Sequence, residues 1–340
     1  QESRGLDVDA LIRDLQTVEN LGISQSLIKT GAGGLDTVDV FPSLRLASNS
    51  GESTWAQTTG DFMRPAIAAL ISAFADTKTF GSLTPIPQVL NDEQLLGITE
   101  RLQYAFQAGD LYARAAAKDL WPLVEQARLL KMRFDAVIAN PPYMGGKGMN
   151  QQLKDFAKET FPNSKSDLFA MFIERGFDWC KPCGFNAMVT MQSWMFLSSY
   201  EAMREKLLNN HSLVSMVQLP YDGKGPTAMG ISFGISITLF QRAKILDIVA
   251  NFDCLRYFEL SEDGAPRAFP SKNERNVRAR PEDFKLIPGS PIVFWISEKV
   301  RNVFLKFPTF ENLAKPRQGM ASTNNAMFVR AWHEVASSKD

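Results

Sequence analysis

Apolar residues recur at helical spacing through most of the first 130 residues. Leu11, Leu15 and Val18 follow this period in the first such segment, where they mark one face of a helix. Asn91, with Gln94 three residues later, has the signature of a capping box at a helix start. Polar, glycine-bearing segments separate the periodic stretches. The pattern predicts helices over residues 7–21, 62–74 and 91–132.

From residue 133 onward, short apolar runs alternate with amphipathic segments. The run at 134–139 is typical of a strand that is buried on both faces of a parallel sheet. The alternation predicts an α/β fold with an open, doubly wound sheet, which binds ligands at the carboxyl ends of its strands. Further strands are expected over 185–191, 213–219 and 231–241, and helices over 167–178 and 199–209.

The C-terminal third is more polar. Residues 262–290 contain several prolines and charged side chains, which predicts a linker or a long loop. A short helix is expected over 297–307, and a further domain is expected to open near Lys315. We therefore divide the chain into a helix-rich part (1–130), an α/β core (131–245), a linker or long loop (246–290) and the start of another domain (291–340).

Composition narrows the class of protein. Of the 340 residues, 45% are hydrophobic, so a sizeable core can form. Lys plus Arg equals Asp plus Glu, 37 each, so any site for a polyanion must come from local clustering. Three cysteines and the absence of an apolar run of membrane-spanning length predict a cytoplasmic protein without disulfides. Because the chain starts at Gln1 and ends without a closing element, we expect it to be part of a longer protein.

The cysteines do not indicate a redox or metal site. Cys180 and Cys183 have C-x-x-C spacing, but they end a predicted helix and precede a strand, the reverse of a thioredoxin-type site. Two cysteines with His211 and His333 far away in the sequence do not suit zinc either. We expect a helix-to-strand turn with buried thiols, and no metal.

The most informative stretch is Asn140-Pro141-Pro142-Tyr143, directly after the first predicted strand. The two prolines stiffen the backbone and hold the Asn140 side chain in place. The Asn140 amide oxygen and the Pro141 carbonyl are two acceptors that suit an exocyclic NH2 group. Tyr143 adds a flat face on which a base can stack, worth about 1–3 kcal/mol.

This arrangement predicts methylation of a planar amine. Hydrogen bonds from both amine protons draw the nitrogen towards tetrahedral geometry and free its lone pair for attack. No strong base is needed, because the proton can leave after the new bond has formed. The protein then contributes mainly positioning and electrostatic preorganisation.

The tetrapeptide resembles the catalytic motif of the S-adenosylmethionine-dependent N6-adenine DNA methyltransferases, and FDAVIANPPYMGGKGM resembles the BREX phage-defence type most closely. TFGSL at 79–83, SDLFAMFIERG at 166–176 and KPRQGMASTNNAMF at 315–328 extend the likeness from about residue 60 onward. The resemblance implies a Rossmann-like methyltransferase sheet, S-adenosylmethionine as cofactor, and a target-recognition domain that begins within 291–340. It also implies that Asn140 and Pro141 accept from adenine N6, and that Tyr143 stacks on a flipped base.

Two observations weigh against this interpretation: one concerns the motif and the other the cofactor site. Asn-Pro-Pro is also an ordinary turn sequence. The glycine-rich cofactor loop of the family is missing, since residues 31–34 do not follow a convincing strand. Asp76 and Asn140 are the candidate cofactor contacts. Asp76 would be an acid for the cofactor adenine, although a solvated helix-end carboxylate is the more ordinary interpretation of this residue. We therefore expect this chain alone to bind S-adenosylmethionine weakly or not at all.

Other residues are candidates for contacts with DNA. Tyr221 is our candidate for a second aromatic wall around a flipped base, with Phe233 as its rival, and a core role suits either equally. Lys147 and Lys224 lie in glycine-rich segments that follow strands, where phosphate contacts and simple solvation are equally compatible. The same two interpretations hold for the basic residues of the polar segment, with phosphate contacts expected chiefly from Arg275, Arg278 and Arg280.

The function expected from all of this is site-specific N6-adenine methylation of double-stranded DNA, in phage defence together with other defence proteins. One alternative is methylation of another planar amide or amine, in a protein glutamine or an RNA base. Another is a non-catalytic DNA-binding fragment, which the missing cofactor loop keeps open.

Overall fold

The computed structural model describes residues 5–16, 59–221, 233–262, 266–270, 272–308 and 314. Lys224, the glycine-rich segment 31–34 and everything from Lys315 onward lie outside the described residues. Within the described ranges, no helix combines the length and the apolar character that crossing a membrane requires.

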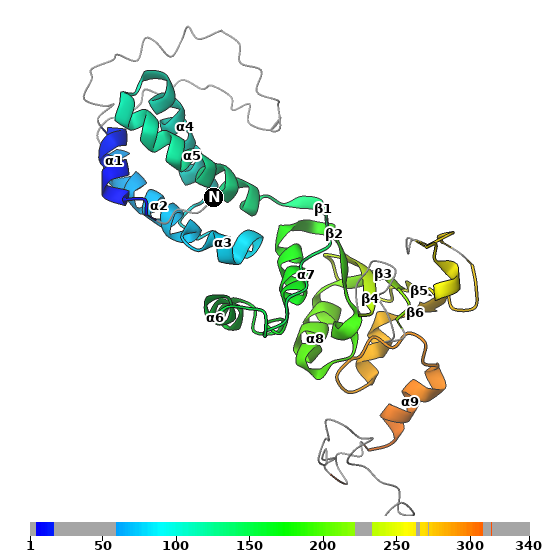
Figure 1. The fold of residues 1–340 in the computed structure, drawn as a ribbon. Coiled ribbons are helices and arrows are strands. Elements are labelled where there is room, and N and C mark those ends of the chain that lie inside the picture. Colours follow the sequence, from blue (N-terminus) through cyan, green and yellow to red (C-terminus); the bar gives the residue numbers. More distant parts are fainter. Residues whose placement is uncertain are drawn as a thin grey trace, which may run out of the picture.

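A group of helices forms the N-terminal part and has a core of its own (Figure 1). It consists of α1 (Val8–Gln16), α2 (Thr59–Phe74), α4 (Asp92–Ala108) and α5 (Leu111–Lys131). Asn91 caps α4 as predicted, with its side chain accepting from the Gln94 N–H at 2.8 Å. The helix expected over 91–132 is two helices, because Gly109 and Asp110 interrupt it and the Asp110 side chain caps α5. The prediction of a helix-rich N-terminal part is confirmed.

The second part is built around a six-stranded sheet in the order β1-β2-β4-β3-β5-β6. The strands are β1 (Phe134–Ala139), β2 (Cys180–Met191), β3 (Ser212–Gln218), β4 (Ile235–Gln241), β5 (Ala250–Cys254) and β6 (Val277–Ala279). The predicted α/β fold is confirmed. However, β4 runs antiparallel to both of its neighbours and β6 antiparallel to β5, so the sheet is mixed and not doubly wound throughout.

Helices cover one face of this sheet. Helices α7 (Leu168–Trp179) and α8 (Glu201–Asn210) contribute to a core around Phe169, Trp194 and Phe240. A smaller cluster joins α3 (Thr77–Phe80) and the 3-10 turn η3 (Gly81–Leu83) to α6 (Gln151–Thr160), with the Phe80 and Phe156 rings stacked at 4.3 Å. This cluster connects the TFGSL segment to the α/β part of the molecule.

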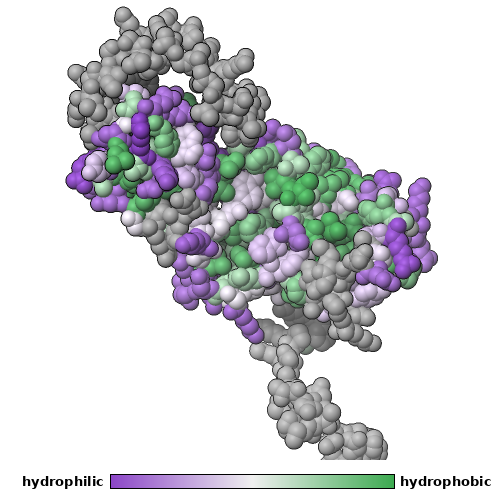
Figure 2. All heavy atoms as spheres, turned by 45° about the horizontal axis from the view of Figure 1, so that its top comes forward, coloured by the Kyte–Doolittle hydropathy of each residue, from purple (hydrophilic) through white to green (hydrophobic). Residues whose placement is uncertain are grey.

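Strand β1 lies at the end of the sheet and is not buried on both faces as predicted. It pairs with β2 on one side only, and Ile138 is 80% exposed. Phe134 on β1 and Phe185 on β2 are each 38% exposed. Figure 2 shows a broad apolar area on this part of the molecule. Among the described residues, β1 is therefore an edge strand with exposed apolar side chains.

The interval 246–290, expected to be a linker or long loop, contributes two strands to the sheet. Phe252 on β5 and Phe284 in the 3-10 turn η7 (Pro281–Leu286) are buried in the same core as α7 and α8. The other described residues of this interval form loops, the turn η6 (Tyr257–Glu259) and η7, and α9 (Glu298–Lys306) follows where a helix was expected. This segment is part of the α/β fold and not a free connection.

Candidate active site at the Asn140 rim

One end of the sheet brings together several of the residues predicted to be functional. The carboxyl ends of β1, β2, β3 and β5 lie there, together with the first residues of the antiparallel strands β4 and β6. We call this end the Asn140 rim. Asn140 follows β1 and Gln192 follows β2, while Phe233 precedes β4. The rim is thus formed by segments that are far apart in the sequence.

The Asn140 carboxamide is exposed and held in place. Pro141 is buried and anchors the backbone beside it. The Tyr143 hydroxyl donates to Asn140 Oδ1 at 2.9 Å and lies 3.2 Å from the Val189 carbonyl oxygen. Burial raises the pKa of Tyr143, so the hydroxyl keeps its proton and remains a donor. Because an amide oxygen has two lone pairs, Oδ1 can still accept a second hydrogen bond from a substrate.

A buried carboxylate fixes the loop that follows the motif. Asp167 is 7% exposed, and its Oδ1 accepts from the Met144 N–H at 2.9 Å and the Phe169 N–H at 3.3 Å. The Leu168 N–H in turn donates to the Met144 carbonyl at 3.1 Å. Burial raises the pKa of Asp167, whereas these N–H groups oppose the rise. Asp167 thus caps α7 and holds the residue after Tyr143 at once.

Aromatic rings surround Tyr143. Its ring meets Phe233 edge-on, with centroids 5.5 Å apart at 84°, and Phe169 at 6.3 Å and 63°. Phe169 is fully buried, whereas Phe233 is partly exposed. Tyr221, the other candidate wall, is 40% exposed beyond the end of β3. Phe233 is therefore the candidate that the structure brings against Tyr143.

Two glutamines on the rim were not found from the sequence. Gln218 Nε2 donates to Gln192 Oε1 at 2.6 Å, and the Gln192 N–H donates to the Gly234 carbonyl at 2.9 Å. A Cβ added at Gly234 would lie 2.0 Å from Gln192 Nε2, so only glycine lets this side chain pack here. Neither glutamine belongs to a local motif, and only the pairing of β2, β3 and β4 brings them together.

A buried arginine supports the segment after β2. Arg204 on α8 is 1% exposed, and its Nη1 donates to the carbonyls of Trp194 at 2.8 Å and Leu197 at 2.6 Å. Its Nε and Nη2 donate to the Gly289 carbonyl at 3.0 and 2.7 Å. Burial lowers the pKa of Arg204. The sequence analysis did not identify this arginine.

The remaining candidates are scattered. Asp76 is partly buried at the start of α3, where its side chain does not cap the helix, and Lys147 is exposed in the loop after the motif. Arg275 forms an ion pair with Glu259 at 2.6 Å. Arg278 is exposed on β6, whereas Arg280 lies at the opposite end of the sheet and pairs with Asp247 at 3.3 Å.

Two further sequence expectations concern the thiols and a metal. Cys180 is buried at the start of β2, but Cys183 is exposed, so the expectation of two buried thiols is wrong for Cys183. Burial raises the pKa of the Cys180 thiol, which keeps it unreactive. Within the described residues, no group of three or more His, Cys, Asp or Glu side chains is placed to hold a metal ion.

Of the two reactants in a methyl transfer, the described residues fit the amine that receives the methyl group better than the cofactor that supplies it. At the rim, Asn140 and Pro141 offer hydrogen-bond acceptors to a planar amine, and Tyr143 offers an aromatic ring. The described residues do not complete a cofactor site: Asp76 is present, but the described glycine-rich loop, 145–148, follows the Asn-Pro-Pro-Tyr motif and not an upstream strand.

The chain is similar in sequence to a methylase family and to adenine-specific methyltransferases. Residues 76–224 match the family described as Eco57I restriction-modification methylase. The chain is 42% identical over 274 residues to the adenine-specific methyltransferase BrxX of Escherichia coli O9:H4 (strain HS), covering 78% of this chain and 22% of BrxX. It is 30% identical over 283 residues to the adenine-specific methyltransferase PglX of Lacticaseibacillus casei (strain Zhang), covering 79% of this chain and 23% of PglX.

The chain thus spans between a fifth and a quarter of the length of these two relatives. A solved structure of a type I R-M system shares 18% identity and a TM-score of 0.36, over 52% of this chain and 42% of that one. The matches to BrxX, PglX and the methylase family confirm the resemblance that the Asn-Pro-Pro-Tyr motif and its neighbouring segments indicated.

Proposed function

The chain is a relative of the BREX-type adenine-specific methyltransferases, and we propose that it carries the base-binding half of a DNA methyltransferase site. The substrate is adenine in double-stranded DNA, and the reaction transfers a methyl group to N6. The observation that carries this proposal is the exposed Asn140 carboxamide at the end of β1, oriented by the Tyr143 hydroxyl at 2.9 Å.

The geometry performs three tasks for the amine. Asn140 Oδ1 and the Pro141 carbonyl accept hydrogen bonds from its two N–H groups, which localises the nitrogen lone pair for attack. Tyr143 and Phe233 offer ring surface to a base that has left the helix, at a cost of a few kcal/mol for unstacking. Asp167 holds the Met144 backbone, so that the loop does not have to reorganise when the base arrives.

The methyltransferase relatives imply the use of S-adenosylmethionine, which supplies the electrophilic methyl group when bound. Asp76 remains our proposed contact to its adenine. We propose that residues outside this chain's described part complete the cofactor site, and that the isolated chain binds the cofactor weakly. Titration calorimetry on the 340-residue chain tests this, and submicromolar binding would contradict it.

For the roles along the sheet, we propose Asn140, Pro141, Pro142 and Tyr143 as the catalytic motif, with Phe233 and then Tyr221 as base-stacking residues. Lys147 and Lys224 stay proposed phosphate contacts, as does Arg278. Arg275 and Arg280 are less suitable, because each guanidinium is already paired with a carboxylate. The comparisons contain no observation that favours a protein or RNA substrate.

The experiment that tests the proposal is methylation of adenine-containing duplex DNA by the full-length protein and two variants. Asn140→Ala should lower the rate by about 100-fold or more, the scale seen when one preorganised hydrogen-bonding group is lost. Asn251→Ala, an exposed asparagine on β5, is the matched control and should leave the rate unchanged. A folded Asn140→Ala protein with the wild-type rate would contradict the mechanism.

A further inference from the structure

A short exposed turn, residues 256–258, lies on the same rim as Asn140. It follows β5, whose carboxyl end points the same way as that of β1. In the strand order, β5 stands four positions from β1. At about 4.8 Å per strand, the turn is about 19 Å along the rim from Asn140. We call residues 256–258 the rim turn.

The rim turn exposes side chains that proteins usually cover. Phe258 is 71% exposed and Tyr257 43%, and Arg256 is exposed beside them. On either side, Leu255 and Leu260 are almost completely buried in one apolar cluster. The backbone is therefore anchored at both ends, and the exposure of the two rings does not come from a loose loop. Adjacent exposed rings of this kind mark contact surfaces more often than chance.

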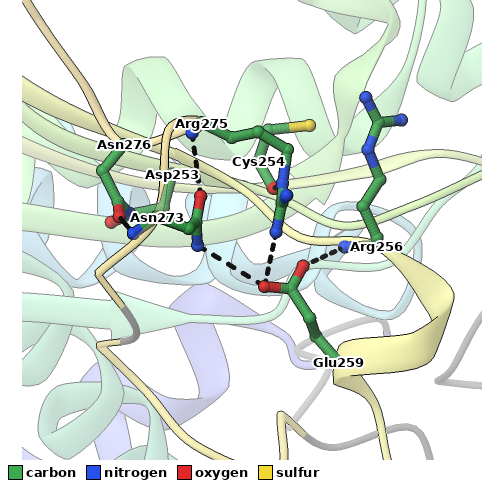
Figure 3. A network of polar contacts seen from close by, with 7 residues as sticks. All are labelled: Asp253, Cys254, Arg256, Glu259, Asn273, Arg275 and Asn276. Atoms are coloured by element: carbon green, nitrogen blue, oxygen red, sulfur yellow. Dashed lines mark hydrogen bonds and ion pairs between the residues drawn. The ribbon is translucent and has the colours of Figure 1, made fainter.

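A polar network stiffens the turn from below (Figure 3). Glu259 accepts from the Arg256 N–H at 2.7 Å, from Arg275 at 2.6 Å and from Asn273 at 3.4 Å. Arg275 also donates to the Cys254 carbonyl at 3.1 Å, and its guanidinium lies 5.6 Å from the centre of the Phe258 ring. In Figure 3 the Arg256 guanidinium points away from this network. Arg275 thus braces the turn, whereas Arg256 is directed outward.

We propose that the rim turn is a second contact with duplex DNA, with Arg256 on a backbone phosphate and Phe258 against the adjacent sugar or base. This inference rests on the proposed function. A separation of about 19 Å corresponds to about six base pairs from the flipped adenine, at 3.4 Å per pair. A rigid contact at that distance holds the duplex in register while one base leaves the stack.

The charges around the rim turn indicate that Arg256 would make its phosphate contact. Among the described residues of the flanking segments, the exposed Glu262 and Glu274 offset much of the charge of the exposed Arg267, Lys272 and Arg278, so the region has no large excess of positive charge. Asn276 donates a hydrogen bond to Asp253, and Arg275 forms an ion pair with Glu259. Both carboxylates therefore already have partners in the network under the rim turn. One guanidinium aimed outward can neutralise one phosphate, and that contribution is measurable as a salt dependence.

The experiment measures the dissociation constant for duplex DNA against salt concentration, with the full-length protein and three variants. Arg256→Ala should reduce the slope of log K against log salt by about 0.9, the value for one phosphate. Arg280→Ala removes the same charge at the opposite end of the sheet, and should leave the slope unchanged. Phe258→Ala should weaken binding about fivefold or more without changing the slope.

The outcomes separate the two proposals. If wild-type protein binds and methylates DNA but Arg256→Ala and Arg280→Ala behave alike, the rim turn is not a DNA contact and the proposed function stands. If wild-type protein shows no affinity for DNA, both proposals fail. Thermal unfolding of each variant should match the wild type, because Arg256 and Phe258 are exposed and the Arg280 ion pair lies at the surface.

Discussion

Replacing Asp167 tests whether a buried carboxylate positions the catalytic loop. In Asp167→Ala, the N–H groups of Met144 and Phe169 lose their acceptor, and α7 loses its cap. In Asp167→Asn, the side-chain oxygen remains and only the charge is removed. Both variants lose the cost of burying the charge, so the difference between them isolates the hydrogen bonds.

The size of that difference follows from the two contacts. A buried donor left without a partner costs about 1–3 kcal/mol, and the loss of a helix cap costs about 1 kcal/mol. Because Met144 is partly exposed, water can replace part of its bond. We therefore expect Asp167→Ala to be about 2 kcal/mol less stable than Asp167→Asn. Asparagine and aspartate cap helices about equally well, so Asp167→Asn should fold like the wild type.

Burial also gives these variants a pH signature. Because burial raises the pKa of Asp167 above 3.8, the folded state holds the proton more tightly than the unfolded state. The wild type should therefore lose stability, relative to Asp167→Asn, as the pH rises above 3.8 towards the raised pKa. Asp167→Asn should show no such loss from this position.

Two assays check the expectation. Denaturant unfolding across pH gives the stabilities, and hydrogen exchange of the peptide that contains Met144 reports the loop itself. Exchange should be faster in Asp167→Ala and unchanged in Asp167→Asn, and the methylation rate should follow exchange. The positioning role would be refuted by an asparagine variant as damaged as the alanine variant, or by an alanine variant that protects Met144 normally.

Three further predictions concern neighbouring groups. Tyr143→Phe keeps the ring but frees Asn140 Oδ1, so the methylation rate should fall by up to about tenfold while the stability changes little; a normal rate would show that the hydroxyl does not orient the carboxamide. Arg204→Lys should destabilise the protein by about 2 kcal/mol or more in denaturant unfolding, because an ammonium group cannot reach the carbonyls of Trp194, Leu197 and Gly289 together. Burial lowers the pKa of His211 to about 4, so stability should fall as the pH drops from 6.5 to about 4, and an equal fall in His211→Gln would assign that loss to other groups.

Much of the fold could be predicted because the signals were local. The Asn91 cap and the apolar runs of β1, β2 and β3 each depend on a few neighbouring residues, and the structure has them within a few positions of the prediction. The Asn-Pro-Pro-Tyr motif is equally local, since four consecutive residues carry both acceptors and the ring. For the same reason its position at the end of β1 could be predicted without knowing the rest of the sheet.

The supporting residues could not be predicted, because their partners are distant in the sequence. Asp167 was expected near a helix start, but its bond to Met144 joins residues 23 positions apart. Arg204 and Gly289 are 85 positions apart. Arg275 has the charge expected of a phosphate contact, and only the structure shows that its guanidinium forms an ion pair with Glu259. Composition identifies a charged side chain, but not whether its partner is a ligand or another part of the chain.

The direction of two strands was not predicted, and it decides where several candidate residues lie. An apolar run does not encode the direction of its strand, so the antiparallel courses of β4 and β6 were not foreseen. In a parallel β4, the residues after Gln241 would reach the Asn140 rim, and Phe233 would lie at the opposite end of the sheet. Because β4 is antiparallel, Phe233 meets the Tyr143 ring at 5.5 Å. The same reversal in β6 turns Arg275 towards the rim and Arg280 away from it. A base pocket with Phe233 as its second aromatic wall therefore requires the antiparallel direction of β4. The contact of Arg275 with the rim turn likewise requires the antiparallel direction of β6.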